Sequence, residues 1–189
     1  SILYGFYGAD SGTIRINGET TTIRNSADAI GKGIGMVHQH FMLVPNFTVL
    51  ENVMLGREGS LSVETGARKA REALKKLSQD FGLAVDPDMI VEDLPVGLQQ
   101  RVEILKALFR GAEILILDEP TGVLTPQETE QLFDILCALR KQGVTILLIT
   151  HKLKEIMAIT DDVSVMRGGE MVAHLQTADT SPAELAELM

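Results

Sequence analysis

Runs of apolar residues along the chain predict two buried strands that both end in polar side chains suited to catalysis. Ile114 to Leu117 form an uninterrupted apolar run before Asp118 and Glu119, and Ile146 to Ile149 form a second run shortly before His151. Such runs are typical of strands covered on both faces in a parallel α/β sheet. We therefore expect the two carboxylates and the histidine at the carboxyl ends of buried strands, where open α/β sheets bind their ligands.

Periodic patterns predict the other elements. Residues 13–17 alternate as a half-exposed strand at an antiparallel edge, and residues 34–38 form another strand. Residues 63–81 carry apolar side chains at helical spacing, which predicts a long amphipathic helix. The remaining expected elements are a helix over 48–55 capped by Thr48, a helix that begins with a capping box at Thr125, a hairpin over 163–173 and a last helix capped by Ser181.

The composition is that of a globular α/β domain. The chain has 189 residues, of which 45% are apolar, and its apolar runs fall far short of the roughly 20 residues of a membrane-spanning helix. A net charge of −9 argues against nucleic acid as a partner, because proteins that bind the phosphate backbone present a basic face. The single cysteine, Cys137, lies among apolar positions of an expected helix, which predicts a buried thiol in a reducing compartment.

Two adjacent carboxylates at a strand end are suited to nucleotide hydrolysis. One carboxylate can hold Mg²⁺ through water while the other polarises the attacking water. We assign the first role to Asp118 and the second to Glu119. Considered alone, these residues also fit a solvated acidic turn at the end of a hydrophobic strand, and the neighbouring motifs must decide between the two interpretations.

Gln39 is a further candidate, because it follows the strand expected over 34–38. Its amide can bind both a metal-bound water and an attacking water, although a polar loop residue is the simpler interpretation of Gln39 alone. The next apolar run, Phe41 to Val44, is expected to pack on the helical part of the chain or on a partner. The histidines that lack the spacing of metal ligands receive no chemical role: His38, His40 and His174.

The order of the motifs resembles the nucleotide-binding subunit of ATP-binding-cassette (ABC) transporters. Along the chain come Gln39, a glycine turn within residues 94–101, the strand that ends in Asp118 and Glu119, and the strand that ends in His151. Four motifs in the family's order at plausible spacings make the resemblance specific. It covers essentially the whole chain.

This resemblance implies an α/β fold of the P-loop NTPase type. The core sheet would be mostly parallel, with an antiparallel β edge and a helical subdomain. The helical subdomain is expected over about residues 48–110, and the core over residues 1–47 and 111–189.

The resemblance also implies ATP and Mg²⁺ as cofactors and suggests a role for each candidate residue. Asp118 and Gln39 would hold Mg²⁺ through water, and Glu119 would polarise the hydrolytic water. His151 would donate a hydrogen bond to the γ-phosphate. Two further candidate residues, Gly97 and Gln99, lie at the start of an expected helix. There they would contact ATP held by an opposing subunit.

Two segments depart from the family's common pattern. Where the family reads Leu-Ser-Gly-Gly-Gln, this chain reads Leu-Pro-Val-Gly-Leu over residues 94–98, so Pro95 removes both a hydroxyl and a backbone donor. Thr125 stands where the family more often has Asp. These changes weaken the polar contacts expected of the turn and put the intersubunit role of the loop before Thr125 in doubt.

A phosphate-binding Gly-x-x-x-x-Gly-Lys-Ser/Thr motif does not occur, because the pair Gly31-Lys32 is followed by glycine and lacks the leading glycine. In the family this loop precedes the segment that matches residues 2–6. We therefore expect a truncated cassette without the first strand and the phosphate loop. Such a chain alone should hydrolyse little or no ATP, because the amides and the lysine that cradle the phosphates are absent.

The implied function is an ATP-binding and ATP-hydrolysing subunit that energises an importer. The string from His38 to Pro45 is most similar to the branch that transports nucleosides or simple sugars. Expected partners are membrane permease subunits, a second ABC cassette in a homodimer or a tandem, and indirectly a solute-binding protein. The subunit would be cytoplasmic and peripheral on the inner face of the cell membrane. The alternatives are a soluble, non-transport ABC ATPase and a non-hydrolysing structural cassette that completes a partner's ATP site.

Overall fold

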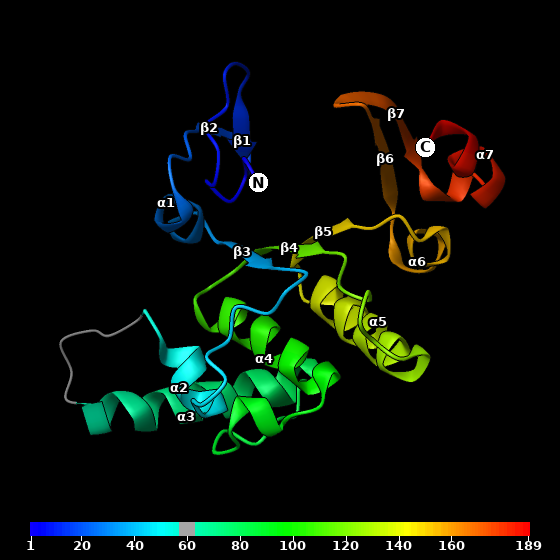
Figure 1. The fold of residues 1–189 in the computed structure, drawn as a ribbon. Helices are drawn as coiled ribbons and strands as arrows, with labels where there is room; N and C mark the ends of the chain where they lie inside the picture. Colours follow the sequence, from blue (N-terminus) through cyan, green and yellow to red (C-terminus); the bar gives the residue numbers. More distant parts are fainter. Residues whose placement is uncertain (57–62) are drawn as a thin grey trace. The chain divides into compact units, whose positions relative to one another are not determined.

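The computed structural model describes residues 1–56 and 63–189, in which short strands and helices follow one another along the chain (Figure 1). The strands are β1 (Ile14–Ile16), β2 (Glu19–Thr21), β3 (Ile34–Val37), β4 (Ile114–Asp118), β5 (Thr145–Ile149), β6 (Asp162–Arg167) and β7 (Glu170–Gln176). The α-helices are α1 (Ser26–Gly31), α2 (Val49–Met54), α3 (Val63–Phe81), α4 (Val96–Phe109), α5 (Pro126–Lys141), α6 (Leu153–Ile159) and α7 (Pro182–Leu188). Two short 3-10 helices complete the set, η1 (Val91–Asp93) and η2 (Thr177–Asp179).

The chain divides into two compact units, Ser1–Leu148 and Ile149–Met189. The sequence analysis did not predict a boundary at this position. The first unit contains the antiparallel pair β1–β2 that was expected at a sheet edge, together with all helices from α1 to α5. The division into a helical subdomain and a core stays a prediction.

A three-stranded sheet in the order β3-β4-β5 forms the centre of the first unit. All four residues of β3 are buried, and so are the three middle residues of the parallel strand β4, which confirms the prediction of a covered strand before Asp118. Gly35 of β3 permits this close packing, because an added Cβ would lie 2.9 Å from the Cβ atoms of both Ala107 and Ala112.

Strand β5 is less buried than the sequence analysis predicted. Thr145, Leu147 and Ile149 are exposed, while Ile146 and Leu148 are half-buried. The prediction of a strand covered on both faces is therefore wrong for β5. The physical reason is that alternate residues of a strand point to opposite faces, and an apolar run does not reveal whether one of those faces stays accessible.

Helices α2, α3 and α4 contact one another within the first unit (Figure 1). Helix α2 begins at the predicted cap, because the hydroxyl of Thr48 accepts a hydrogen bond from the N–H of Glu51 and the Glu51 carboxylate accepts one from the N–H of Thr48 at 2.7 Å. Helix α3 buries Ala70 and Leu74 of the predicted apolar face. Both helices thus form where the local pattern indicated.

The second unit contains the predicted hairpin, formed by the antiparallel strands β6 and β7. Gly168 and Gly169 connect the strands with φ angles of +61° and +86°, which side chains other than glycine rarely adopt. The predicted cap of the last helix is present as well, because the hydroxyl of Ser181 accepts a hydrogen bond from the N–H of Glu184 at 3.2 Å.

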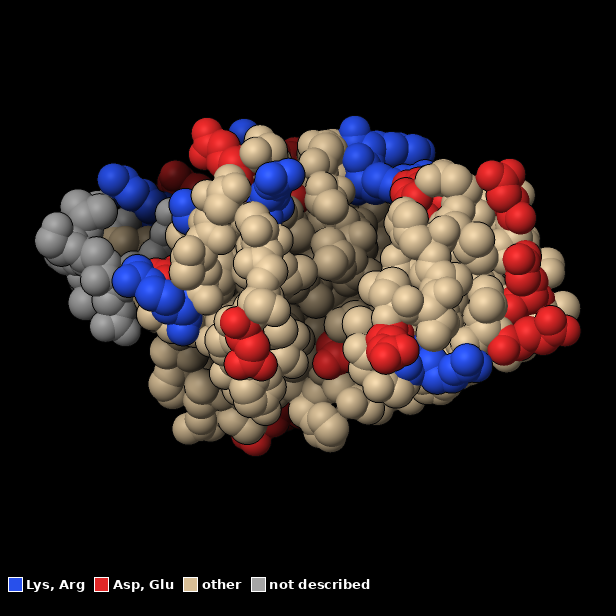
Figure 2. Space-filling model, turned by 90° about the horizontal axis from the view of Figure 1, so that it is seen from above, with Lys and Arg blue, Asp and Glu red and all other residues tan. Residues whose placement is uncertain are grey.

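The surface carries groups of both charges. Figure 2 shows Lys and Arg side chains interspersed with Asp and Glu side chains on the face that it presents. The exclusion of nucleic acid, which rests on the net charge of −9, stays a prediction. None of the helices described over residues 1–56 and 63–189 has the length and apolar character needed to cross a membrane.

Candidate functional site

The parallel register of β3 and β4 brings three predicted site residues to one edge of the sheet. Val37, the last residue of β3, lies opposite Leu117, and β4 continues for one residue to Asp118. Gln39 comes two residues after the end of β3, and Glu119 comes directly after β4. The amide and the two carboxylates therefore follow neighbouring strand ends.

Glu119 turns the chain sharply out of β4. Its φ angle is +46°, in the left-handed region that non-glycine residues rarely occupy, at a cost of about 1–2 kcal/mol. The N–H of Gly122 donates to the carbonyl of Glu119 at 3.1 Å and closes the turn. Both Asp118 and Glu119 are half-buried. Backbone strain of this kind clusters at functional sites, which supports a chemical role for this strand end.

His38 lies at the same edge and packs as a neutral side chain. Its ring contacts the rings of Tyr4 and Phe6, with centroid distances of 5.9 and 5.6 Å. Burial lowers the pKa of His38, against the opposing effect of the negative charges of Glu103 and Asp118. Its ring is therefore mostly uncharged at neutral pH.

Lys106 of α4 anchors the loop that follows Gln39. Its Nζ donates to the carbonyl oxygen of Met42 at 2.7 Å and to Oε1 of Glu103 at 2.8 Å. Only 1% of the Glu103 side chain is exposed, so the ion pair lies largely out of water. We call residues 94–98 the signature-like turn, and α4 begins within this turn. Lys106 thereby fixes the loop after Gln39 to the same helix.

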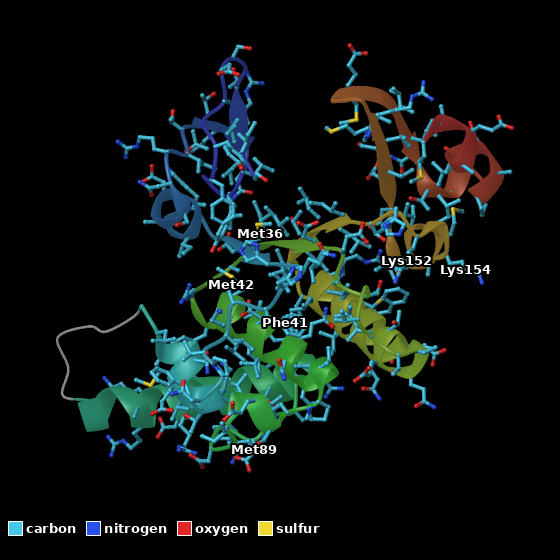
Figure 3. The ribbon with its side chains drawn as sticks, viewed as in Figure 1. Met36, Phe41, Met42, Met89, Lys152 and Lys154 are labelled. Atoms are coloured by element: carbon cyan, nitrogen blue, oxygen red, sulfur yellow. The ribbon has the colours of Figure 1, made fainter. Side chains whose placement is uncertain are left out.

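Asn52 of α2 holds the same loop two residues further on. Its Oδ1 accepts from the Val44 N–H at 2.7 Å, and its Nδ2 donates to the Val44 carbonyl at 3.0 Å. Phe41 and Val44 are half-buried, whereas the side chain of Met42 is 64% exposed (Figure 3). The expected packing of this apolar run on the chain itself therefore applies only in part.

Polar groups of the signature-like turn already have hydrogen-bond partners within the chain. Pro95 is the N-cap of α4 and supplies no side-chain acceptor. The N–H of Gly97 instead donates to Oε1 of Glu128 at 3.2 Å, and Nε2 of Gln99 donates to the carbonyl of Leu94 at 2.9 Å. The assignment of Gly97 and Gln99 to ATP held by an opposing subunit stays a prediction.

Sequence reasoning missed Gln100, which connects α4 to the acidic strand end. The side chain is 2% exposed, and its Nε2 donates to the carbonyl of Pro120, directly after Glu119, at 2.6 Å. One signal was present, because Gln100 lies four residues before Ile104 and therefore on the apolar face of the helix. A polar residue on that face indicates a buried hydrogen bond.

His151 follows β5 in the second unit, and its side chain is exposed. The Thr150 hydroxyl donates to Glu155 at 3.0 Å and accepts from the Lys152 N–H at 3.1 Å, which shapes the turn around His151. In the part of the chain that the structure describes, no three His, Cys, Asp or Glu side chains gather as a metal site. Cooperation between His151 and Glu119 stays a prediction.

Comparison with known proteins places these motifs in a family. A model of the ABC transporter family matches residues 1–122, a segment that includes Gln39, the signature-like turn, Asp118 and Glu119. The chain belongs to the ABC transporter family. Its membership confirms the resemblance on which the site residues were assigned.

Several relatives that align with the whole chain are named as import ATP-binding proteins. The chain is 47% identical to the nucleoside import ATP-binding protein NupA of Lactococcus lactis subsp. cremoris and 48% identical to the guanosine import ATP-binding protein NupO of Bacillus subtilis, in each case over 100% of this chain and 37% of the relative. It is 44% identical to the glucose import ATP-binding protein TsgD13 of Haloferax volcanii, over 100% of this chain and 39% of that protein. The chain thus spans less than two fifths of the length of these relatives.

Solved structures of ABC cassettes share the fold. The ADP conformation of MJ1267, an ATP-binding cassette of an ABC transporter, superposes with a TM-score of 0.79 at 23% identity and covers 98% of this chain and 80% of that chain. A nucleotide-free ATP-binding cassette from an ABC transporter gives the same TM-score and identity, and covers 99% of this chain and 76% of that one. These similarities confirm the predicted α/β fold of the P-loop NTPase type.

Proposed function

We propose that the chain contributes to ATP binding and hydrolysis in an ABC importer. The observation that carries the proposal is the parallel register of β3 and β4, from which Gln39, Asp118 and Glu119 follow at adjacent strand ends. An amide and two carboxylates so arranged are the polar groups that metal-assisted hydrolysis of a nucleotide requires. Membership of the ABC transporter family supports the same activity.

In this proposal Glu119 polarises the attacking water and His151 donates to the γ-phosphate. The half-buried carboxylate of Glu119 sits on a strained backbone that points the chain away from β4. A carboxylate directly after a strand of a packed sheet starts from a defined backbone position, which favours general-base catalysis. The histidine contributes a hydrogen bond and no metal contact.

The donor set fits Mg²⁺ at the same strand ends. The Asp118 carboxylate and the Gln39 amide offer oxygen atoms, which this ion prefers. Mg²⁺ is commonly bound by one or two carboxylates, waters and substrate phosphates, so a cluster of three protein ligands, which the described residues do not form, is not required. When bound, the ion would offset phosphate charge, and the two residues would orient its water ligands.

An ABC importer would provide this chain with three kinds of partner. A second ABC cassette, in a homodimer or a tandem, would present its ATP to Gly97 and Gln99 of this chain. Membrane permease subunits would contact the exposed Met42 on the loop after Gln39, and a solute-binding protein would act through them. The protein would lie on the cytoplasmic face of the membrane. Relatives named for nucleoside, guanosine and glucose import support nucleosides or simple sugars as the solute.

A non-hydrolysing cassette that completes a partner's ATP site is the second candidate. Pro95 and Thr125 motivate it, because both depart from the family's pattern in segments that would meet an opposing cassette. Glu119 and His151 argue against this candidate, because a site without hydrolysis has no need for both.

Mg²⁺-dependent ATP hydrolysis tests the choice. The assay uses the gene product that contains residues 1–189, beside residues 1–189 alone, which carry no Gly-x-x-x-x-Gly-Lys motif and should be inactive. In the gene product, Glu119→Gln should lower kcat by about 10²–10⁴-fold, the usual contribution of a general base. Glu113→Gln is the matched control, because Glu113 is exposed just before the opposite end of β4.

The outcomes separate the candidates. Hydrolysis that depends on Glu119 but not on Glu113 supports the ATPase, and inactivity of the wild-type gene product supports the structural cassette. Equal activity of wild type and Glu119→Gln would show that Glu119 is not the general base. Uptake of labelled guanosine and labelled glucose by cells that carry wild type or the Glu119→Gln variant then distinguishes the two classes of solute.

A further inference from the structure

The carboxylate of Glu128 on α5 binds backbone groups of two different segments. Its Oε1 accepts a hydrogen bond from the Gly97 N–H at 3.2 Å. Its Oε2 accepts from the N–H and from the hydroxyl of Thr125, each at 2.9 Å. One side chain therefore joins the signature-like turn to the loop 120–125, which follows the acidic strand end.

The bond to Gly97 replaces a cap that the turn itself lacks. The first N–H groups of a helix need partners from outside the helix, and Pro95 at the N-cap offers no side-chain oxygen. A carboxylate near a helix amino terminus is also favoured by the helix dipole. The hydrogen bonds from Thr125, and to a smaller extent the one from Gly97, lower the pKa of Glu128 and keep it charged at neutral pH.

A side chain at position 97 would displace the Glu128 carboxylate. A Cβ added at Gly97 would lie 2.7 Å from Oε1 of Glu128 and 3.0 Å from its Cδ. Nearby, Nη2 of Arg101 donates to Oε1 of Gln131 at 2.7 Å and forms a second link between α4 and α5. When the signature-like turn moves, Glu128 must therefore move with it or lose a hydrogen bond.

We propose that Glu128 is a positioning residue that couples the signature-like turn to the loop 120–125. The inference rests on the proposed function, in which the turn faces ATP of an opposing cassette while the loop follows Glu119, the residue that acts on the chain's own ATP. Glu128 thus transmits a displacement at one ATP site to the other. It touches no reacting atom and acts through Gly97 and Thr125.

The Glu128→Gln variant tests the double contact. Glutamine has a single acceptor oxygen and a donor in place of the second one, so it can serve only one of the two segments. In residues 1–189, we expect hydrogen exchange at the amide of either Gly97 or Thr125 to accelerate by about tenfold. Glu130→Gln, exposed on the same helix, is the control and should change neither amide. Unchanged exchange at both amides in Glu128→Gln would overturn the proposal.

Gly97→Ala tests the transmission itself. Its Cβ should displace Glu128 and accelerate exchange at the Thr125 amide by about tenfold, although Thr125 is unaltered. When Glu128 is already replaced by alanine, Gly97→Ala should no longer affect Thr125, because the connecting side chain is gone. An equal effect in both backgrounds, or no effect in either, contradicts coupling through Glu128.

ATP hydrolysis by the full gene product separates this inference from the proposed function. If the wild type is inactive, the proposed function fails, while amide exchange still decides whether Glu128 joins the two segments. If the wild type is active, Glu128→Gln should lower the Hill coefficient for ATP, because the two sites no longer influence each other. A Hill coefficient and a kcat equal to those of the wild type would overturn the link between ATP sites.

Discussion

Nε2 of Gln100 lies 2.6 Å from the carbonyl oxygen of Pro120, the residue that directly follows Glu119. Both residues are buried, so this carbonyl depends on the glutamine for its hydrogen bond. The position of Glu119 after β4 is thereby tied to α4, the helix that begins at the signature-like turn. Support of a strained strand end from a neighbouring helix is what a preorganised catalytic carboxylate needs.

We expect Gln100→Leu to lower the free energy of unfolding by about 1–3 kcal/mol, because a buried acceptor loses its donor. Urea unfolding of residues 1–189 measures this change. Gln79→Leu, the same substitution at an exposed position of α3, should stay within about 0.5 kcal/mol of wild type. Equal losses in the two variants would contradict a structural role for the bond to Pro120.

Lys106 provides a second prediction, because it is the cation that pairs with the buried Glu103. Lys106→Met leaves this carboxylate without its partner and should destabilise the chain by about 3–5 kcal/mol. It also frees the Met42 carbonyl, so the loop after Gln39 should exchange its amide hydrogens faster.

The double variant Lys106→Met with Glu103→Leu distinguishes the two effects. The double variant should recover much of the lost stability, because no buried charge remains. The amide hydrogens of the loop after Gln39 should still exchange faster than in wild type, because the Met42 carbonyl still lacks the Lys106 donor. Lys76→Met on the exposed side of α3 is the control for the substitution itself. A double variant as unstable as Lys106→Met alone would refute the argument from the unpaired carboxylate.

Local patterns were sufficient to predict the elements of the fold that carry the site. The apolar run before Asp118 indicated a covered strand, and the three middle residues of β4 are indeed buried. The equivalent run in β5 led to a wrong prediction, because burial of its second face depends on which element packs there. Thr48 and Thr125 were recognisable caps, since a capping box needs only residues three positions apart.

The connections between elements were not predictable from the sequence. Lys106 binds a carbonyl 64 residues away, and Gln100 binds one 20 residues away. No local pattern reveals such partners. Their only trace is a polar or charged residue on the apolar face of α4. Gln39, Asp118 and Glu119 were identified because they follow strands, whereas their common location at one sheet edge required the pairing of β3 with β4.

The pH dependence of stability provides a third prediction, based on Glu51 at the start of α2. Hydrogen bonds from the backbone and then the side chain of Thr48 lower the pKa of Glu51. A carboxyl with a lowered pKa in the folded state contributes stability that is complete above its ordinary pKa and is lost as the pH falls through the folded-state value. Unfolding free energy should therefore fall less steeply with acid in Glu51→Gln than in wild type. Glu72→Gln, exposed on α3, should keep the wild-type slope, and a wild-type slope in Glu51→Gln would contradict the cap.

Asn52 provides the last prediction, because it connects α2 to the loop that carries Gln39. It is fully buried and bonds both the N–H and the carbonyl of Val44, so Asn52→Ala leaves two backbone groups without partners. We expect a loss of at least about 2 kcal/mol in unfolding free energy and faster hydrogen exchange at the Val44 amide. Asn46→Ala, at an exposed position of the same connection, should change neither quantity. If Asn52→Ala unfolds at the wild-type urea concentration with a protected Val44 amide, the loop is held by other contacts, and Asn52 has no part in positioning Gln39.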